Sequence, residues 1–132
     1  MSVPADLDAL LADAGLTDKA VKLDGSLVRF QWGSAFVIAG ISGTAVVAIS
    51  PLFKQLPAGR ELEFYKKLLE LNAHMGGMAA FAIQPDGWVV LHAARGVKGL
   101  DGQELATLIA GVGRFADQFD DQLAAEFFAP TA

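Results

Sequence analysis

Twenty consecutive residues, Ser34 to Phe53, carry no charged side chain. A stretch of this length could cross a membrane as a helix, or it could form two buried strands. Its middle, Gly40-Ile41-Ser42-Gly43-Thr44, contains turn-forming residues, and its two arms are rich in Val, Ile and Phe. Because such arms around a glycine turn favour strands, we expect a β-hairpin here and no membrane-spanning helix.

The residues on both sides of this stretch extend the β pattern. Apolar Val28, Phe30 and Trp32 alternate with polar residues, which predicts a strand, and Asp24-Gly25 before them predicts a turn. We therefore expect three antiparallel strands between residues 21 and 53, and a short fourth strand before them is the alternative. Further along, MAAFAI and WVVLHAA flank Gln84-Pro85-Asp86-Gly87, which predicts a second β-hairpin.

Three segments have helical periodicity. The first is short, with Ser2 as N-cap, Pro4 in its first turn and a stripe of Leu7, Leu10, Leu11 and Ala14. The second, RELEFYKKLLELNAHMGG, places Leu62, Tyr65, Leu68, Leu69 and Asn72 along one face and Glu63 four residues before Lys67. The third begins at the N-cap Asp101, with Glu104 three residues later, and carries an apolar stripe to Phe127.

This order predicts a single α+β domain over residues 1–132: an N-terminal helix, an antiparallel meander, a helix, a hairpin, and a long C-terminal helix packed on the sheet. The composition is 53% hydrophobic, which is more than one small core needs, so we expect apolar surface that a partner covers. The net charge of −5 disfavours nucleic acid as a partner. The absence of cysteine suits a reducing cytoplasm.

Residues able to do chemistry are few and scattered. No acidic residue lies within five positions of His92, so its own strand offers no acceptor to orient a catalytic base. His74 and His92 lack zinc-ligand spacing, and the glycines of GVGR lie within a helix, where close packing explains them better than a phosphate loop. We expect no catalytic residue, metal or cofactor. The acidic side chains of the last helix predict a solvated face: Asp117, Asp120, Asp121 and Glu126.

Two sets of apolar residues are candidates for contacts with other chains. Four aromatic residues of the predicted strands could form a surface that binds a partner protein: Phe30, Trp32, Phe36 and Trp88. Three leucines of the second helix could form a dimer interface: Leu68, Leu69 and Leu71. Alternation alone does not establish which of these side chains are exposed.

The second half of the chain resembles two groups of proteins. Residues 64–127 contain a helix ending in LLELN, an apolar strand, a PDG turn, a second strand, and a long helix that begins after Leu100-Asp101. This pattern resembles YbjN-like proteins and type III secretion chaperones of the Tir-chaperone type; the first half matches only in element order. The resemblance implies a compact homodimer without catalytic residues, whose exposed sheet and helix surfaces bind a client. Of the two groups, we favour the YbjN-like one, because the sequence shows neither an effector nor a secretion apparatus.

The function we expect is that of a non-enzymatic, cytoplasmic, chaperone-like or regulatory protein that binds a protein client as a homodimer. One alternative is a small-molecule-binding or enzymatic domain, with a pocket between the sheet and the long helix near His92 and Arg95. Another is a nucleic-acid-associated regulator that uses Arg60, Lys66 and Lys67, which the acidic net charge disfavours.

Overall fold

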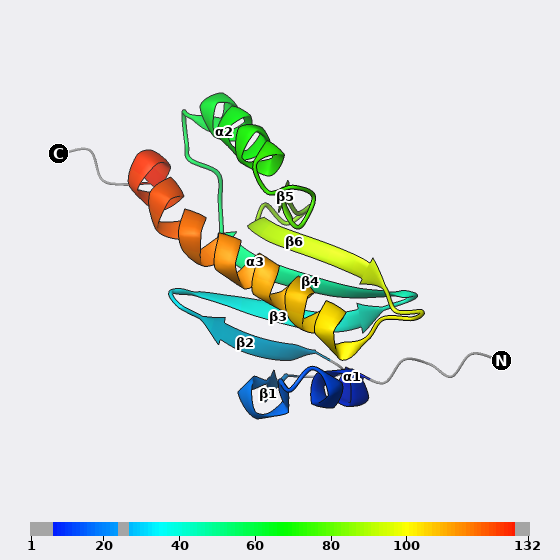
Figure 1. Cartoon of the computed structure of the whole chain (residues 1–132). Helices are drawn as coiled ribbons and strands as arrows, with labels where there is room; N and C mark the ends of the chain where they lie inside the picture. Colours follow the sequence, from blue (N-terminus) through cyan, green and yellow to red (C-terminus); the bar gives the residue numbers. More distant parts are fainter. Residues whose placement is uncertain (1–6, 24–26, 129–132) are drawn as a thin grey trace.

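The computed structural model describes residues 7–23 and 27–128, and it has the predicted α+β order (Figure 1). The elements are α1 (Leu7–Asp13), a 3-10 turn (Thr17–Lys19), β1 (Val21–Lys22), β2 (Val28–Trp32), β3 (Ala35–Ser42), β4 (Ala45–Phe53), α2 (Glu61–Ala73), β5 (Ala80–Ile83), β6 (Val89–Gly96), α3 (Gly102–Leu123) and a π-helical turn (Ala124–Phe128). The predicted fold class is confirmed. The expected N-cap Ser2, Pro4 and the Asp24-Gly25 turn lie outside the described residues.

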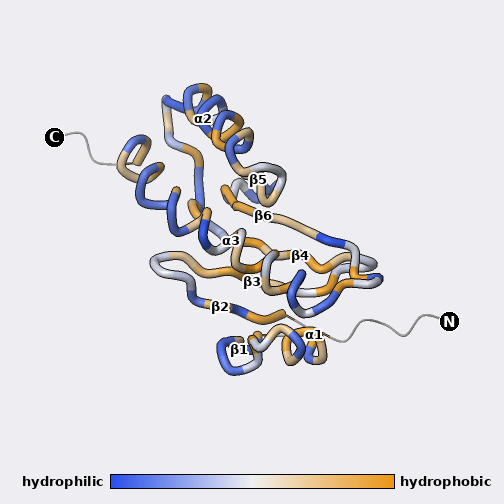
Figure 2. The backbone as a smooth tube through the Cα atoms, viewed as in Figure 1, coloured by the Kyte–Doolittle hydropathy of each residue, from blue (hydrophilic) through white to orange (hydrophobic). Residues whose placement is uncertain are grey.

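The strands form one six-stranded antiparallel sheet in the order β1-β2-β3-β4-β6-β5. The uncharged stretch forms the β3–β4 hairpin, and β3, β4 and β6 are hydrophobic along most of their length (Figure 2). Its turn lies at Gly43-Thr44, where Gly43 has φ of 59°, while Gly40 lies inside β3. Among the described helices, none is long and apolar enough to cross a membrane.

Helix α3 packs across one face of the sheet, where it contacts β2, β3, β4 and β6. Its inward side chains include Leu105, Ile109 and Val112, which have no exposed surface. The predicted cap is present, because the Asp101 carboxylate accepts a hydrogen bond of 2.8 Å from the Glu104 backbone N–H. Helix α1 packs beside the start of α3, and this helix pair and the sheet enclose the core.

Helix α2 lies at the other end of the sheet, beside β5 (Figure 1). Its Asn72 side chain accepts a 2.7 Å hydrogen bond from the Phe81 backbone N–H and so caps an outward group of the edge strand. Three of the five residues expected along one face of α2 are exposed, namely Leu62, Tyr65 and Leu69, and the buried residues of the helix are Phe64, Leu68 and Leu71. The helix carries apolar residues on two sides, and the side with Phe64 fills the core.

Candidate protein-binding surfaces

The two faces of the sheet differ in what covers them. Residues of β3 and β4 alternate between buried and half-buried, and the buried set lies under α3. The pairing of the strands places Arg29, Ile38, Ile49, His92 and Ala80 in one row across five strands on the opposite face. The described helices pack on the α3 side or at the end of the sheet, so this opposite side is called the open face.

The open face is apolar and partly accessible. Its central side chains are half-buried, with little charge among them: Phe36, Ile38, Val47, Ile49, Pro51, Ala80, Ala82 and His92. Val90 lies on the same face and is only 2% exposed, yet it does not belong to the core cluster under α3. An apolar patch of this kind on a protein surface marks a site of contact with another molecule.

The four aromatic residues proposed for partner binding do not form one surface. Phe30 is 2% exposed and faces α3, as does half-buried Trp32. Phe36 lies on the open face, where the Arg29 guanidinium sits 4.1 Å from the centre of its ring. Trp88 is half-buried beside the β5–β6 turn. In the isolated chain, therefore, Phe36 and Trp88 are open to a partner at different places, and Phe30 is enclosed.

The outer side of α2 is a second apolar surface. Leu62 is 81% exposed and Leu69 is 69% exposed, and together with Tyr65 and Ala73 they line a shallow hollow. These four residues are called the α2 stripe. Of the three leucines proposed for a dimer interface, only Leu69 belongs to it, since Leu68 and Leu71 are buried. Glu63, Lys66 and Glu70 flank the stripe.

His92 and Arg95 do not converge on one pocket. Strand alternation places His92 on the open face and Arg95 on the α3 side, at the end of β6. A hollow of about 380 Å³ beside Arg95 is lined by Asp101, Gln103, Glu104, Thr107 and Leu108, and His92 is not part of it. The geometry therefore gives no support to a ligand site that uses both residues.

The acidic residues of the last helix lie on the expected solvated face, where Asp117, Asp121 and Glu126 are exposed, but Asp117 and Asp120 also contact the β2–β3 turn. Ser34, in the turn between β2 and β3, donates from its backbone N–H and from its hydroxyl to the Asp117 carboxylate, each at 2.9 Å. Its hydroxyl also lies 2.7 Å from the Asp120 carboxylate. The backbone hydrogen bond, and then the hydroxyl, lower the pKa of Asp117. Contacts between residues so distant in sequence leave no periodic signal, so the pattern could not reveal them.

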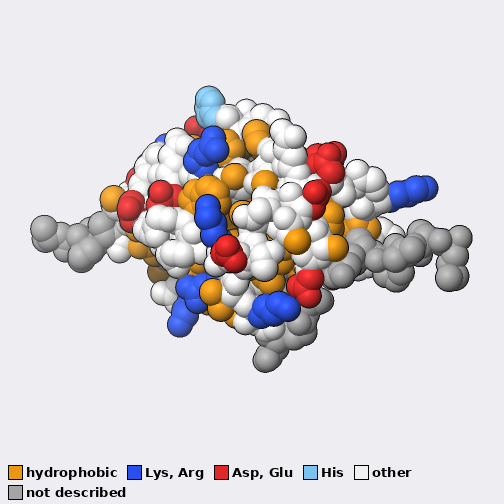
Figure 3. Space-filling view, turned by 60° about the horizontal axis from the view of Figure 1, so that its bottom comes forward, with side chains coloured by type: hydrophobic (Ala, Val, Ile, Leu, Met, Phe, Trp, Pro, Cys, Tyr) orange, Lys and Arg blue, Asp and Glu red, His pale blue; other side chains and the backbone are white. Residues whose placement is uncertain are grey.

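Charges of both signs are interspersed on the side of the molecule seen in Figure 3. Apolar side chains lie in the middle of this view, with Lys, Arg, Asp and Glu side chains around them. On the part of this side that the structure describes, the basic residues form no continuous field of the kind that binds a phosphate backbone.

The six-stranded antiparallel sheet with a long C-terminal helix on one face places the protein in the α+β fold class. A family model described as the Tir chaperone protein (CesT) family matches residues 7–118. The chain therefore belongs to the Tir chaperone (CesT) family. The match falls on the second of the two groups that the sequence resembles, and it includes most of the first half of the chain.

A solved structure titled "Crystal Structure of the ExsC-ExsE Complex" has a similar fold. The TM-score is 0.53, the sequence identity is 14%, and the match covers 79% of this chain and 74% of the other. At this identity the likeness concerns the fold. A search of curated proteins finds no match for this chain.

Proposed function

We propose that this protein is a non-enzymatic, cytoplasmic chaperone that binds a protein client through the open face, as a homodimer formed through the α2 stripe. The observation that carries the proposal is the open face itself. Ile38, Ile49 and their neighbours form an apolar layer in the middle of the sheet, and neither α3 nor α2 packs over it. A partially unfolded client can bury its own apolar side chains there without any catalytic group.

Three further facts support a macromolecular partner. The open face extends across five adjacent strands, whereas a small ligand needs a concave pocket that encloses it. Membership of a chaperone family fits a protein client. The similar fold was solved in a structure whose title names a complex, which agrees with a fold that can carry a partner.

The homodimer is proposed from the α2 stripe. Leu62, Tyr65, Leu69 and Ala73 follow a spacing of three, four and four residues, which forms one continuous line on a helix. In a two-fold arrangement this line would meet its own copy, and Lys66 of one copy could approach an acidic residue of the other. Such a contact would remove the two most exposed leucines from water.

The client surface is tested by a charge placed in the open face. The protein is captured from its own lysate, the co-purifying protein is identified, and binding of that purified client is measured for Ile38→Asp and for Gln31→Asp. Both residues lie on the same side of neighbouring strands, but Gln31 is exposed and polar. We expect Ile38→Asp to weaken binding at least tenfold, with an unchanged circular dichroism spectrum, and Gln31→Asp to bind normally. Equal binding by both variants would contradict a client on this face.

The dimer is tested by light scattering coupled to size-exclusion chromatography. We expect the wild-type chain to elute with the mass of a dimer and Leu69→Asp with the mass of a monomer. Leu27→Asp is the matched control, because Leu27 is also an exposed leucine (44%) but lies just before β2, away from α2. A monomeric wild-type chain, or a dimeric Leu69→Asp variant, would exclude the α2 stripe as the interface.

A further inference from the structure

Helix α2 has few contacts with the sheet that it flanks. Its main strand contact is with β5, a four-residue edge strand. Its N-cap residue makes no side-chain cap hydrogen bond, so the local support of its first turn is limited to contacts of Glu61 with the Gly59 N–H and of Glu63 with Arg60. Other groups must therefore hold α2, and with it the exposed α2 stripe, in a defined position.

The C-terminal π-helical turn supplies an aromatic contact for the inner side of α2. The Phe64 ring, which is fully buried, meets Phe127 at a centroid distance of 5.1 Å and Phe128 at 5.8 Å, both edge to face. Phe128 stacks on Phe53 of β4 at 4.5 Å. Four rings from α2, β4 and the C-terminal turn thus form one cluster, in which the turn contacts both the helix and the sheet.

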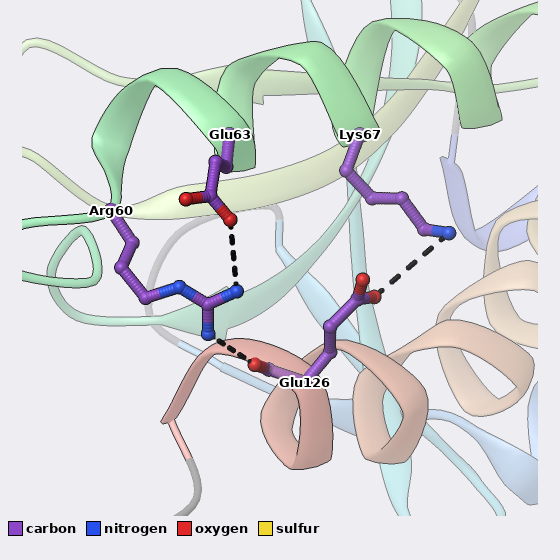
Figure 4. A network of polar contacts seen from close by, with 4 residues as sticks. All are labelled: Arg60, Glu63, Lys67 and Glu126. Atoms are coloured by element: carbon purple, nitrogen blue, oxygen red, sulfur yellow. Dashed lines mark hydrogen bonds and ion pairs between the residues drawn. The ribbon is translucent and has the colours of Figure 1, made fainter.

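Polar contacts reinforce the same junction (Figure 4). Arg60, just before α2, donates to the Glu126 backbone carbonyl, and its guanidinium lies 4.7 Å from the centre of the Phe127 ring. The second terminal nitrogen of the Arg60 guanidinium, Nη2, donates to the Glu63 carboxylate at 3.0 Å. Lys67, about two turns further along α2, lies 3.9 Å from the Glu126 carboxylate. The C-terminal π-helical turn therefore contacts α2 both at its start, through Arg60, and about two helical turns later, through Lys67.

We propose that Glu126, Phe127 and Phe128 form a clamp that positions α2, and that this clamp determines how well the α2 stripe binds a second copy of the chain. The clamp residues contact the inner side of α2, whereas the stripe is on the outer side. They are thus positioning residues and not part of the dimer contact. This inference rests on the proposed dimer, but the clamp itself can be tested without it.

The test combines amide hydrogen exchange with the dimer dissociation constant for Arg60→Ala, Phe128→Ala and Leu69→Asp in the full chain. Asp121→Asn serves as a control, because it removes a charge from the same end of α3, where the described side chains offer it no hydrogen bond or ion pair. We expect Arg60→Ala and Phe128→Ala to accelerate exchange in residues 61–73 about tenfold while β3 and β4 stay protected. We also expect these two variants to weaken the dimer at least fivefold.

The outcomes separate the clamp from the dimer. Unchanged exchange in α2, or faster exchange over the whole sheet, would overturn the clamp. Faster exchange in α2 with a normal dimer constant would overturn its role in self-association. If Leu69→Asp leaves the oligomeric state unchanged, the proposed interface is wrong, yet the exchange data still decide whether the turn holds α2.

Discussion

The indole ring of Trp32 lies directly against the backbone of α3 at Gly113. A Cβ atom at residue 113 would come within 2.5 Å of the Trp32 Cδ2 atom, a distance that side chains do not tolerate. Glycine inside a helix costs about 1 kcal/mol relative to alanine. At this position the close contact between helix and strand offsets that cost, which confirms for Gly113 the expectation that the glycines of GVGR serve close packing.

Two glycines of α3 should respond to alanine in opposite directions. Gly113→Ala should lower the free energy of unfolding by about 1 to 2 kcal/mol, because the overlap with Trp32 outweighs the better helix propensity. Gly111→Ala should raise it by up to about 1 kcal/mol, since the new Cβ would meet only the mobile Met78 Cε atom at 3.4 Å. Urea denaturation of both variants measures this difference. A stabilised Gly113→Ala variant would show that Trp32 can move aside.

A buried hydroxyl in β4 offers a stabilising substitution. Ser50 is fully buried on the α3 side of the sheet, and its Oγ atom has no hydrogen-bond partner among the described residues. An unsatisfied buried polar group costs about 1 to 3 kcal/mol, so Ser50→Ala should raise the free energy of unfolding by about 1 kcal/mol. Ser34→Ala, which removes a bonded hydroxyl, should instead lower it by about 1 kcal/mol or less. Calorimetry of both proteins tests the contrast, and a destabilised Ser50→Ala variant would contradict it.

The order of the elements could be read from the sequence because it rests on local patterns. The Asp101 cap, the turn before Trp88 and the β3–β4 hairpin each depend on residues that are close together in the chain. What the sequence could not supply is which side of an apolar element faces the core. Helix α2 has apolar residues on two sides, and its contacts with Phe53 of β4 and with the C-terminal turn bury Phe64 while Leu62 stays exposed.

The same limit applied to the candidate surfaces. Phe30 and Phe36 look alike in sequence, and within one continuous strand their separation of six residues would place them on the same face. Because a turn lies between them, they are on opposite faces of the sheet. The two-residue turn at Gly33-Ser34 pairs Trp32 with Ala35, and this register places Phe36 beside Gln31. The register is set by the turn and by the pairing partners, and alternation within one strand does not contain this information.

The two sides of α2 should differ sharply in their effect on stability. Phe64→Ala should lower the free energy of unfolding by about 3 to 5 kcal/mol, because the ring is fully buried among three others. Phe64→Leu, which keeps more of the volume, should cost roughly 1 to 2 kcal/mol and gives a measurable value if the alanine variant does not fold. Leu62→Ala should stay within about 0.5 kcal/mol when measured at a protein concentration that favours the monomer. A large loss for Leu62→Ala under that condition would mean that the outer side of α2 also packs within the chain.

The contact between Ser34 and Asp117 should make stability depend on pH in acid. Hydrogen bonds from Ser34 lower the pKa of Asp117 in the folded chain below the ordinary value of about 3.9. A carboxyl with a lowered pKa stabilises the fold at pH values above its unfolded pKa, and this contribution is lost as the pH falls through the folded pKa. Wild type should therefore exceed Asp117→Asn in melting temperature at pH 7 and keep that advantage to about pH 5.

Below about pH 4 the advantage should shrink towards zero, because a protonated Asp117 and an asparagine offer Ser34 similar neutral acceptors. Asp121→Asn controls for the change in net charge, since the Ser34 hydrogen bonds among the described residues go to Asp117 and Asp120. Melting curves of the three proteins from pH 7 to pH 3 provide the measurement. A difference between wild type and Asp117→Asn that stays constant down to pH 3 would show that the carboxylate charge does not anchor the turn.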